Sequence, residues 1–119
     1  MKILLTVFLI LNFLGEGAAA AILIYSPASV FSEGQIEGIV WARNYGFAAL
    51  AIASTILWVW PHRDNSDVLG AVLGMLLTFH IGLAIALGWS GGQTGGAVMH
   101  SILALFAGFL FAQRHKWCT

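Results

Sequence analysis

The sequence has little charge, little proline and a single cysteine. Only 8% of its 119 residues are charged, whereas 60% are hydrophobic, and the mean hydropathy is +0.90. A soluble globular domain carries roughly 25% charged residues, so this composition is that of a membrane protein. Five basic and five acidic residues balance, which leaves no basic excess for nucleic-acid binding. The partner that the composition predicts is the lipid bilayer.

The cysteine count excludes two further classes. Cys118 stands alone, so neither a disulfide framework nor a CxxC redox or zinc motif is possible. The glycine-rich stretch SGGQTGG contains no GK[ST] and no GxGxxG, which excludes the common nucleotide-binding loops.

Four apolar segments are long enough to cross a bilayer, which needs about 20 apolar residues per helix. Pro61 ends the second segment, and Asn65 or Ser66 can cap the third. Tryptophan and tyrosine stand at the segment ends, where amphipathic rings prefer the membrane interface. We therefore expect an all-α integral membrane four-helix bundle, a single domain 1–119 with helices over 3–25, 43–60, 68–89 and 97–112.

The basic residues predict the orientation, because short cytoplasmic loops are rich in Lys and Arg. One side carries four of them, whereas the other carries Arg43 together with Glu33 and Glu37. Both termini are then cytoplasmic in a multi-pass protein of the cytoplasmic membrane, and segment 26–42 lies outside as a short amphipathic surface helix. The four basic residues are Lys2, Arg63, Arg114 and Lys116.

The N-terminus also has features of a signal peptide. A basic start, an apolar stretch and Ala18-Ala19-Ala20 fit that pattern. The apolar run continues through AILIY to Tyr25, however, which completes a full span. We expect residues 1–20 to be retained as part of the first helix.

Each predicted span carries one ionisable residue that is costly inside a bilayer. At about 1.5 Å of rise per residue, all four fall in the outer half of the membrane. Their convergence predicts a site that binds or helps to move a small molecule. Arg43 would meet an anionic group at the entrance, and Asn12 and Ser54 would support the site from the faces of Glu16 and Arg43. The four predicted site residues are Glu16, Arg43, His80 and His100.

His80 stands in an apolar run long enough to cross a membrane, so its imidazole needs a polar partner. Glu16 and His80 both lie about 18 Å above the cytoplasmic ends of their spans. An imidazole or a carboxylate facing lipid would be left unsatisfied. We therefore predict that His80 faces the interior and lies within hydrogen-bonding distance of Glu16, directly or through one water.

Other interpretations of these residues stay open. The polar groups can be structural contacts between helices, worth about 0.6 kcal/mol each. Glu16, His80 and His100 form a 2-His-1-carboxylate set, but no two of them are spaced as ligands on one helix. His80 and His100 are also a candidate haem pair, against which stands a depth offset of about 6 Å. We accordingly predict no cofactor and assign no metal ligand.

Small residues at four-residue spacing form a ridge on the third span, opposite His80. Such a pattern permits close helix contact, so an accessory or scaffold subunit, in a homo-oligomer or a larger complex, is the second hypothesis. An intramembrane enzyme with His80 or Glu16 as acid or base is the third, and we predict binding rather than catalysis. The ridge consists of Gly70, Gly74, Thr78, Gly82 and Ala86.

Several stretches resemble the DoxX-like group of small bacterial four-helix membrane proteins. They are YSPASVF after the first span, ARNYGFAALAIA in the second, and FHIGLAIA and MHSILAL in the third and fourth. The resemblance implies a four-helix bundle in the cytoplasmic membrane and an accessory role in a membrane redox complex. It assigns no catalytic residue.

Overall fold

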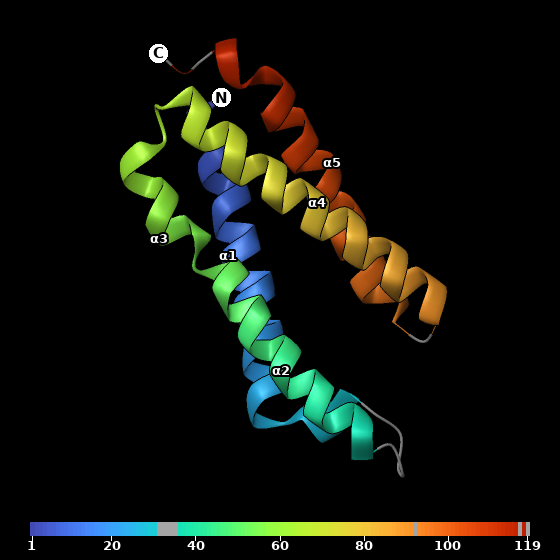
Figure 1. Ribbon diagram of the computed structural model, residues 1–119. Coiled ribbons are helices and arrows are strands. Elements are labelled where there is room, and N and C mark those ends of the chain that lie inside the picture. The colour runs from blue at the N-terminus through green and yellow to red at the C-terminus, as the bar shows by residue number, and fades with distance from the viewer. Residues whose placement is uncertain (31–35, 92, 117, 119) are drawn as a thin grey trace. The chain divides into compact units, whose positions relative to one another are not determined.

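The computed structural model describes residues 1–30, 36–91, 93–116 and 118, with the backbone alone for 36 and 37. The described residues form helices and turns and contain no strand (Figure 1). Glu33, used in the orientation argument, and Trp117, one of the tryptophans at the ends of the predicted segments, lie outside the described residues. The elements are α1 (Lys2–Tyr25), η1 (Pro27–Val30), α2 (Ile36–Ala53), α3 (Thr55–Val59), η2 (Trp60–His62), α4 (Ser66–Ser90), α5 (Thr94–Gln113) and η3 (Arg114–Lys116).

The predicted all-α class is confirmed, and three helical segments of the described chain are long and apolar enough to cross a membrane. They are Lys2–Tyr25, Ser66–Ser90 and Thr94–Lys116. The second predicted span, 43–60, differs from the structure. Its helix begins at Ile36, inside the segment expected on the surface, and is interrupted at Ser54 before α3. Because α2 includes Glu37 and Arg43, it is more polar than these three segments. A fourth membrane span therefore stays a prediction.

The chain divides into two compact units, one of residues 1–8 and 58–119 and the other of residues 9–57. In the first unit α4 and α5 lie side by side and antiparallel (Figure 1). Small residues bring the two helices together. A Cβ at Gly74 would stand 3.5 Å from Phe111, and one at Gly108 would stand 3.6 Å from Leu77. The turn between them starts at Gly91, whose φ of 68° favours glycine.

The start of α4 is fixed by Asn65, one of the two predicted caps. Its side-chain Oδ1 accepts hydrogen bonds from the backbone nitrogens of Asp67 and Val68, each at 3.0 Å. The cap satisfies two of the donors that a helix leaves open at its N-terminus. Asp67 in the first turn adds a charge that favours the helix dipole.

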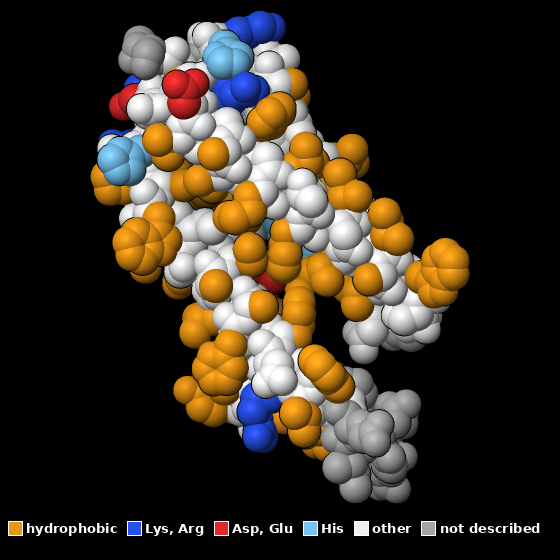
Figure 2. Space-filling view, viewed as in Figure 1, with side chains coloured by type: hydrophobic (Ala, Val, Ile, Leu, Met, Phe, Trp, Pro, Cys, Tyr) orange, Lys and Arg blue, Asp and Glu red, His pale blue; other side chains and the backbone are white. Residues whose placement is uncertain are grey.

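Both ends of the first unit's chain lie near this start of α4. Lys2 forms an ion pair with Asp64, and Ser66 hydrogen-bonds to His115 at 2.8 Å. Figure 2 shows charged and histidine side chains gathered at this end, with apolar side chains along the visible face of α4. The two ends of the chain therefore meet at one end of the unit. Which side of a membrane this end faces stays a prediction.

In the second unit, α2 runs beside the C-terminal part of α1 (Figure 1). Gly46 permits the approach, because a Cβ there would stand 3.0 Å from the Cβ of Leu23 and 3.2 Å from the backbone nitrogen of Ile24. Any larger residue would push the two helices apart.

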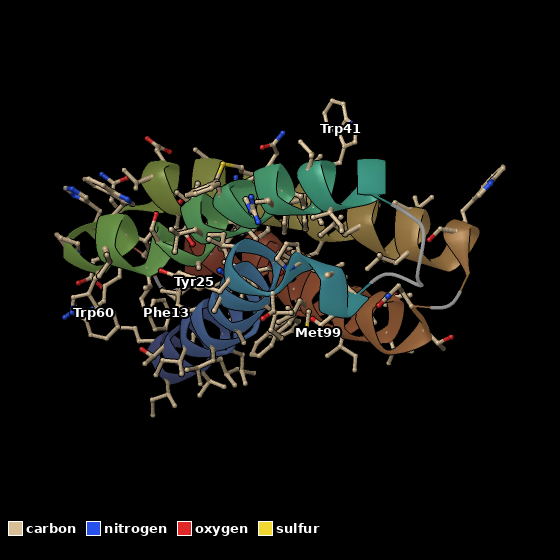
Figure 3. The ribbon with its side chains drawn as sticks, turned by 90° about the horizontal axis from the view of Figure 1, so that it is seen from below. Phe13, Tyr25, Trp41, Trp60 and Met99 are labelled. Atoms are coloured by element: carbon tan, nitrogen blue, oxygen red, sulfur yellow. The ribbon has the colours of Figure 1, made fainter. Side chains whose placement is uncertain are left out.

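The aromatic residues at helix ends are exposed, as interfacial rings would be. Trp41 and Trp60 project from α2 and η2 (Figure 3). Apolar side chains are also exposed along the length of α1, α4 and α5. An apolar exterior of this kind suits a bilayer better than water. The exposed aromatic residues at or near helix ends are Tyr25, Trp58, Trp60 and Trp89, whereas the exposed Trp41 lies inside α2.

Candidate functional site

The polar residues buried in the described chain come from four of its helices. Three of them, Glu16, His80 and His100, are predicted site residues. Asn12 was predicted as a supporting residue, and Thr55 was not singled out by the sequence. The buried polar side chains are Asn12, Glu16, Thr55, His80 and His100.

His80 and His100 face each other within the first unit. Because α4 and α5 run antiparallel from a short turn, residues 80 and 100 come opposite one another. The two Nδ1 atoms are 2.9 Å apart, the ring centroids are 5.2 Å apart, and the ring planes are inclined by 34°. His80 is 0% exposed and His100 is 5% exposed. One Nδ1 is protonated and donates a hydrogen bond, and the other Nδ1 accepts it with its lone pair. The two neutral rings are therefore in opposite tautomers.

Phe79 lies against both imidazoles. Its ring meets His80 edge-on at 5.2 Å between centroids and His100 at 6.0 Å. Phe79 was not among the residues that the sequence predicted for the site. Phe79 supplies an apolar wall, so that the contact between the histidines is made in low-dielectric surroundings.

The contact corrects one step of the sequence analysis. The depth offset of about 6 Å was used against a haem held by His80 and His100, and the estimate of that offset was wrong, because the two rings are in contact. It assumed that the ends of α4 and α5 are level, whereas the two helices have different lengths, 25 and 20 residues. A haem still does not fit this arrangement. Axial ligands stand on opposite faces of the macrocycle, whereas these nitrogens touch.

In the second unit, Asn12 of α1 forms hydrogen bonds with the residues at the break between α2 and α3. Its Nδ2 donates to the backbone oxygen of Ile52 at 3.2 Å and to Oγ1 of Thr55 at 3.4 Å. Thr55 in turn donates to the same Ile52 oxygen at 2.7 Å, and Ser54 donates to the Ala51 oxygen at 2.7 Å. Asn12 and Ser54, predicted as supporting residues, therefore act at a helix break.

Glu16 and Arg43 belong to the second unit, and their surroundings differ. Glu16 is only 1% exposed and follows Asn12 by one helical turn, whereas Arg43 is exposed on α2. The contact of Glu16 with His80 and the place of Arg43 at an entrance stay predictions. Within the first unit, the two buried imidazoles of His80 and His100 are of a ligand type that holds transition-metal ions.

The ridge of small residues on α4 is divided. At its start, a Cβ on Gly70 would stand 2.9 Å from Nε of Arg114, and Gly74 lies beside Phe111. Arg114 stacks over the Phe111 ring at 4.1 Å. This half therefore packs within the unit. The remaining members, Thr78, Gly82 and Ala86, are exposed, and no atom stands within 4 Å of a Cβ built on Gly82.

Comparison of the chain with protein families, curated proteins and solved structures found no match. The resemblance to the DoxX-like group is therefore untested and stays a prediction. The interpretation of the site depends on its own residues and their contacts.

Proposed function

We propose that this is a small integral membrane protein whose buried polar site binds, or helps to move, a small molecule. The observation that carries the proposal is the contact of His80 with His100 between two helices apolar enough to span a membrane. The proposal includes the predicted location in the cytoplasmic membrane with both termini inside.

A purely structural role accounts poorly for this pair. The helices already pack through apolar side chains, since Leu73, Leu76, Leu103 and Ala107 are buried along α4 and α5. Interhelical polar contacts in membranes add only about 0.6 kcal/mol on average, and polar groups inside a span are costly to place there. Two imidazoles thus add little to the stability of the helix packing that two leucines would not add. Unlike leucine, however, they can exchange protons and bind ligands.

The test is to identify what copurifies with the protein. We would purify the chain in mild detergent and analyse its extract by mass spectrometry, metal analysis and an absorbance scan. A ligand that is present in the wild type and lost in His80→Asn and His100→Asn is expected. Ser101→Ala is the matched control, because Ser101 adjoins His100, is exposed and only donates to the Ala97 oxygen of its own helix.

The proposal fails if no molecule depends on the two histidines, or if the variants keep every ligand-dependent shift in thermal stability. An accessory or scaffold subunit is the second candidate. The observation in its favour is the exposed part of the ridge around Gly82. The surface available to a partner is smaller than predicted, because Gly70 and Gly74 pack within the unit.

A further inference from the structure

We propose that the ligand is a divalent transition-metal ion held by Nδ1 of His80 and Nδ1 of His100. This inference rests on the proposed function and names the chemical class of its ligand. It depends on the geometry of the histidine pair inside the first unit.

The distance between the two nitrogens suits two ligands of one ion. A zinc ion binds imidazole nitrogen at about 2.0–2.1 Å, so two ligands at a right angle stand about 2.9 Å apart and two at the tetrahedral angle about 3.3 Å apart. The observed separation of the Nδ1 atoms is 2.9 Å. An ion therefore needs the two Nδ1 atoms to separate by a few tenths of an ångström at most, and each ring to turn by roughly 35–45° so that its lone pair points at the ion instead of at the other nitrogen.

The proton that forms the hydrogen bond between the two rings must leave Nδ1 before both nitrogens can bind an ion. In the metal-free pair one Nδ1 is protonated and the other is not. Ligation requires a lone pair on both, so the protonated ring must move its proton from Nδ1 to Nε2. Two neutral imidazoles then bind the ion without a net change in the protons on the pair, and each keeps an Nε2–H that can donate a hydrogen bond.

The surroundings suit a transition metal rather than Ca²⁺ or Mg²⁺. Imidazole is a ligand of Zn²⁺, Fe²⁺, Ni²⁺ and Cu²⁺, whereas Ca²⁺ and Mg²⁺ take oxygen ligands. Phe79 lies edge-on to both rings and fixes their orientation from one side. The remaining coordination positions can be taken by water.

The experiment uses the whole chain in detergent with any affinity tag removed. Co²⁺ and Zn²⁺ are titrated separately, with the Co²⁺ absorption bands and calorimetry giving the affinity and stoichiometry. X-ray absorption of the Zn²⁺ form gives the number of imidazoles. We expect one ion per chain and two imidazoles at about 2.0–2.1 Å. This measurement on the wild type needs no variant, so a folding defect in a variant cannot obscure it.

Variants then assign the ligands. Asparagine places a polar group near the Nδ1 position without an imidazole, and each of His80→Asn and His100→Asn should weaken binding by about 100-fold or more, since even the partners of metal ligands are worth 10–100-fold. His62→Ala is the control, because His62 is exposed in η2 of the same unit and its loss should leave the affinity unchanged.

Two results would overturn the metal proposal: no uptake of either ion, or uptake that survives both histidine variants. The proposed function is judged separately by the copurification experiment. An organic molecule that is lost with the histidines would retain the binding function and reject the metal. Neither a metal nor an organic molecule depending on them would reject both.

Discussion

Nδ2 of Asn12 donates a hydrogen bond to the backbone oxygen of Ile52 at 3.2 Å, and this bond ties α1 to the point at which α2 ends. A helix that stops within an apolar layer must satisfy its backbone groups by other means. Here side chains do so, because Thr55 donates to the same oxygen. The interruption at Ser54 is therefore supported by a residue from another helix.

The first prediction concerns this support. Asn12→Ala should destabilise the protein by about 0.6 kcal/mol, the average for polar contacts between membrane helices, and by no more than about 1.7 kcal/mol, the largest value found for one. Asn44→Ala is the control, since Asn44 is exposed on α2. Thermal unfolding in detergent measures the loss, and hydrogen exchange should increase at residues 52–56. Equal stability of the two variants would contradict the role given to Asn12.

The second prediction concerns the packing of α1 on α2. Gly46→Ala should cost about 1–3 kcal/mol, the range for overpacking, because the new Cβ would meet backbone and Cβ atoms of α1 that cannot rotate away. Gly17→Ala should be neutral or stabilising by up to about 1 kcal/mol, since alanine is the better helix former and no atom lies within 4 Å of its Cβ. A comparison of unfolding midpoints decides the matter, and a harmless Gly46→Ala would refute the close approach.

The third prediction separates the two halves of the ridge on α4. Gly74→Leu should lower stability by about 1–3 kcal/mol, because the side chain would enter the contact with Phe111. Gly82→Leu should change it by less than about 0.5 kcal/mol, as is usual for surface sites. Both are read by thermal unfolding together with crosslinking. If Gly82→Leu abolishes an oligomer that the wild type forms, the accessory-subunit hypothesis gains over ligand binding.

The fourth prediction tests the expected contact of Glu16 with His80. In a double-mutant cycle of Glu16→Gln and His80→Asn, residues in contact show an interaction energy of about 0.5–3 kcal/mol. We expect a value in this range, because the sequence puts both groups at the same depth and the ring of His80 has a second nitrogen that can bond to a carboxylate. Pairing Glu16→Gln with His62→Ala provides the control. Additivity within about 0.5 kcal/mol for the first pair would show that the two do not touch.

The fifth prediction concerns pH at the end of the first unit. The pKa of Asp64 is lowered, first by the hydrogen bond from Lys2, against an opposing effect of desolvation, and further by the charges of Lys2 and Arg63. A carboxyl group whose pKa is lowered in the folded state stabilises the fold at pH values above its ordinary pKa. This contribution is lost as the pH falls through the pKa of the folded state. Because both side chains are more than half exposed, the effect is small and screened by salt. Carboxyl NMR should show Asp64 returning toward its ordinary pKa in Lys2→Met and unchanged in Lys116→Met.

The helices could be predicted from the sequence more completely than the contacts of the candidate site. The start of α4 followed from Asn65, a local signal read within three residues. The break at Ser54 did not, because its support comes from Asn12, 40 residues from Ile52 in the chain. Thr55 and Phe79 were missed for the same reason. A threonine or a phenylalanine in an apolar run gives no sign of which side chains from other helices it will meet.

By itself, the sequence determined that this is an all-helical chain with apolar segments long enough for a membrane, since hydropathy and turn residues act over a few neighbours and need no partner. It also identified the histidines as polar groups that must be buried together with something polar. Only the tertiary structure decided that His80 meets His100 at 2.9 Å, because the shift of one helix along another is set by packing. Small residues such as Gly74 and Gly108 fix that shift where they let α4 and α5 approach, and counting residues from helix ends cannot supply it.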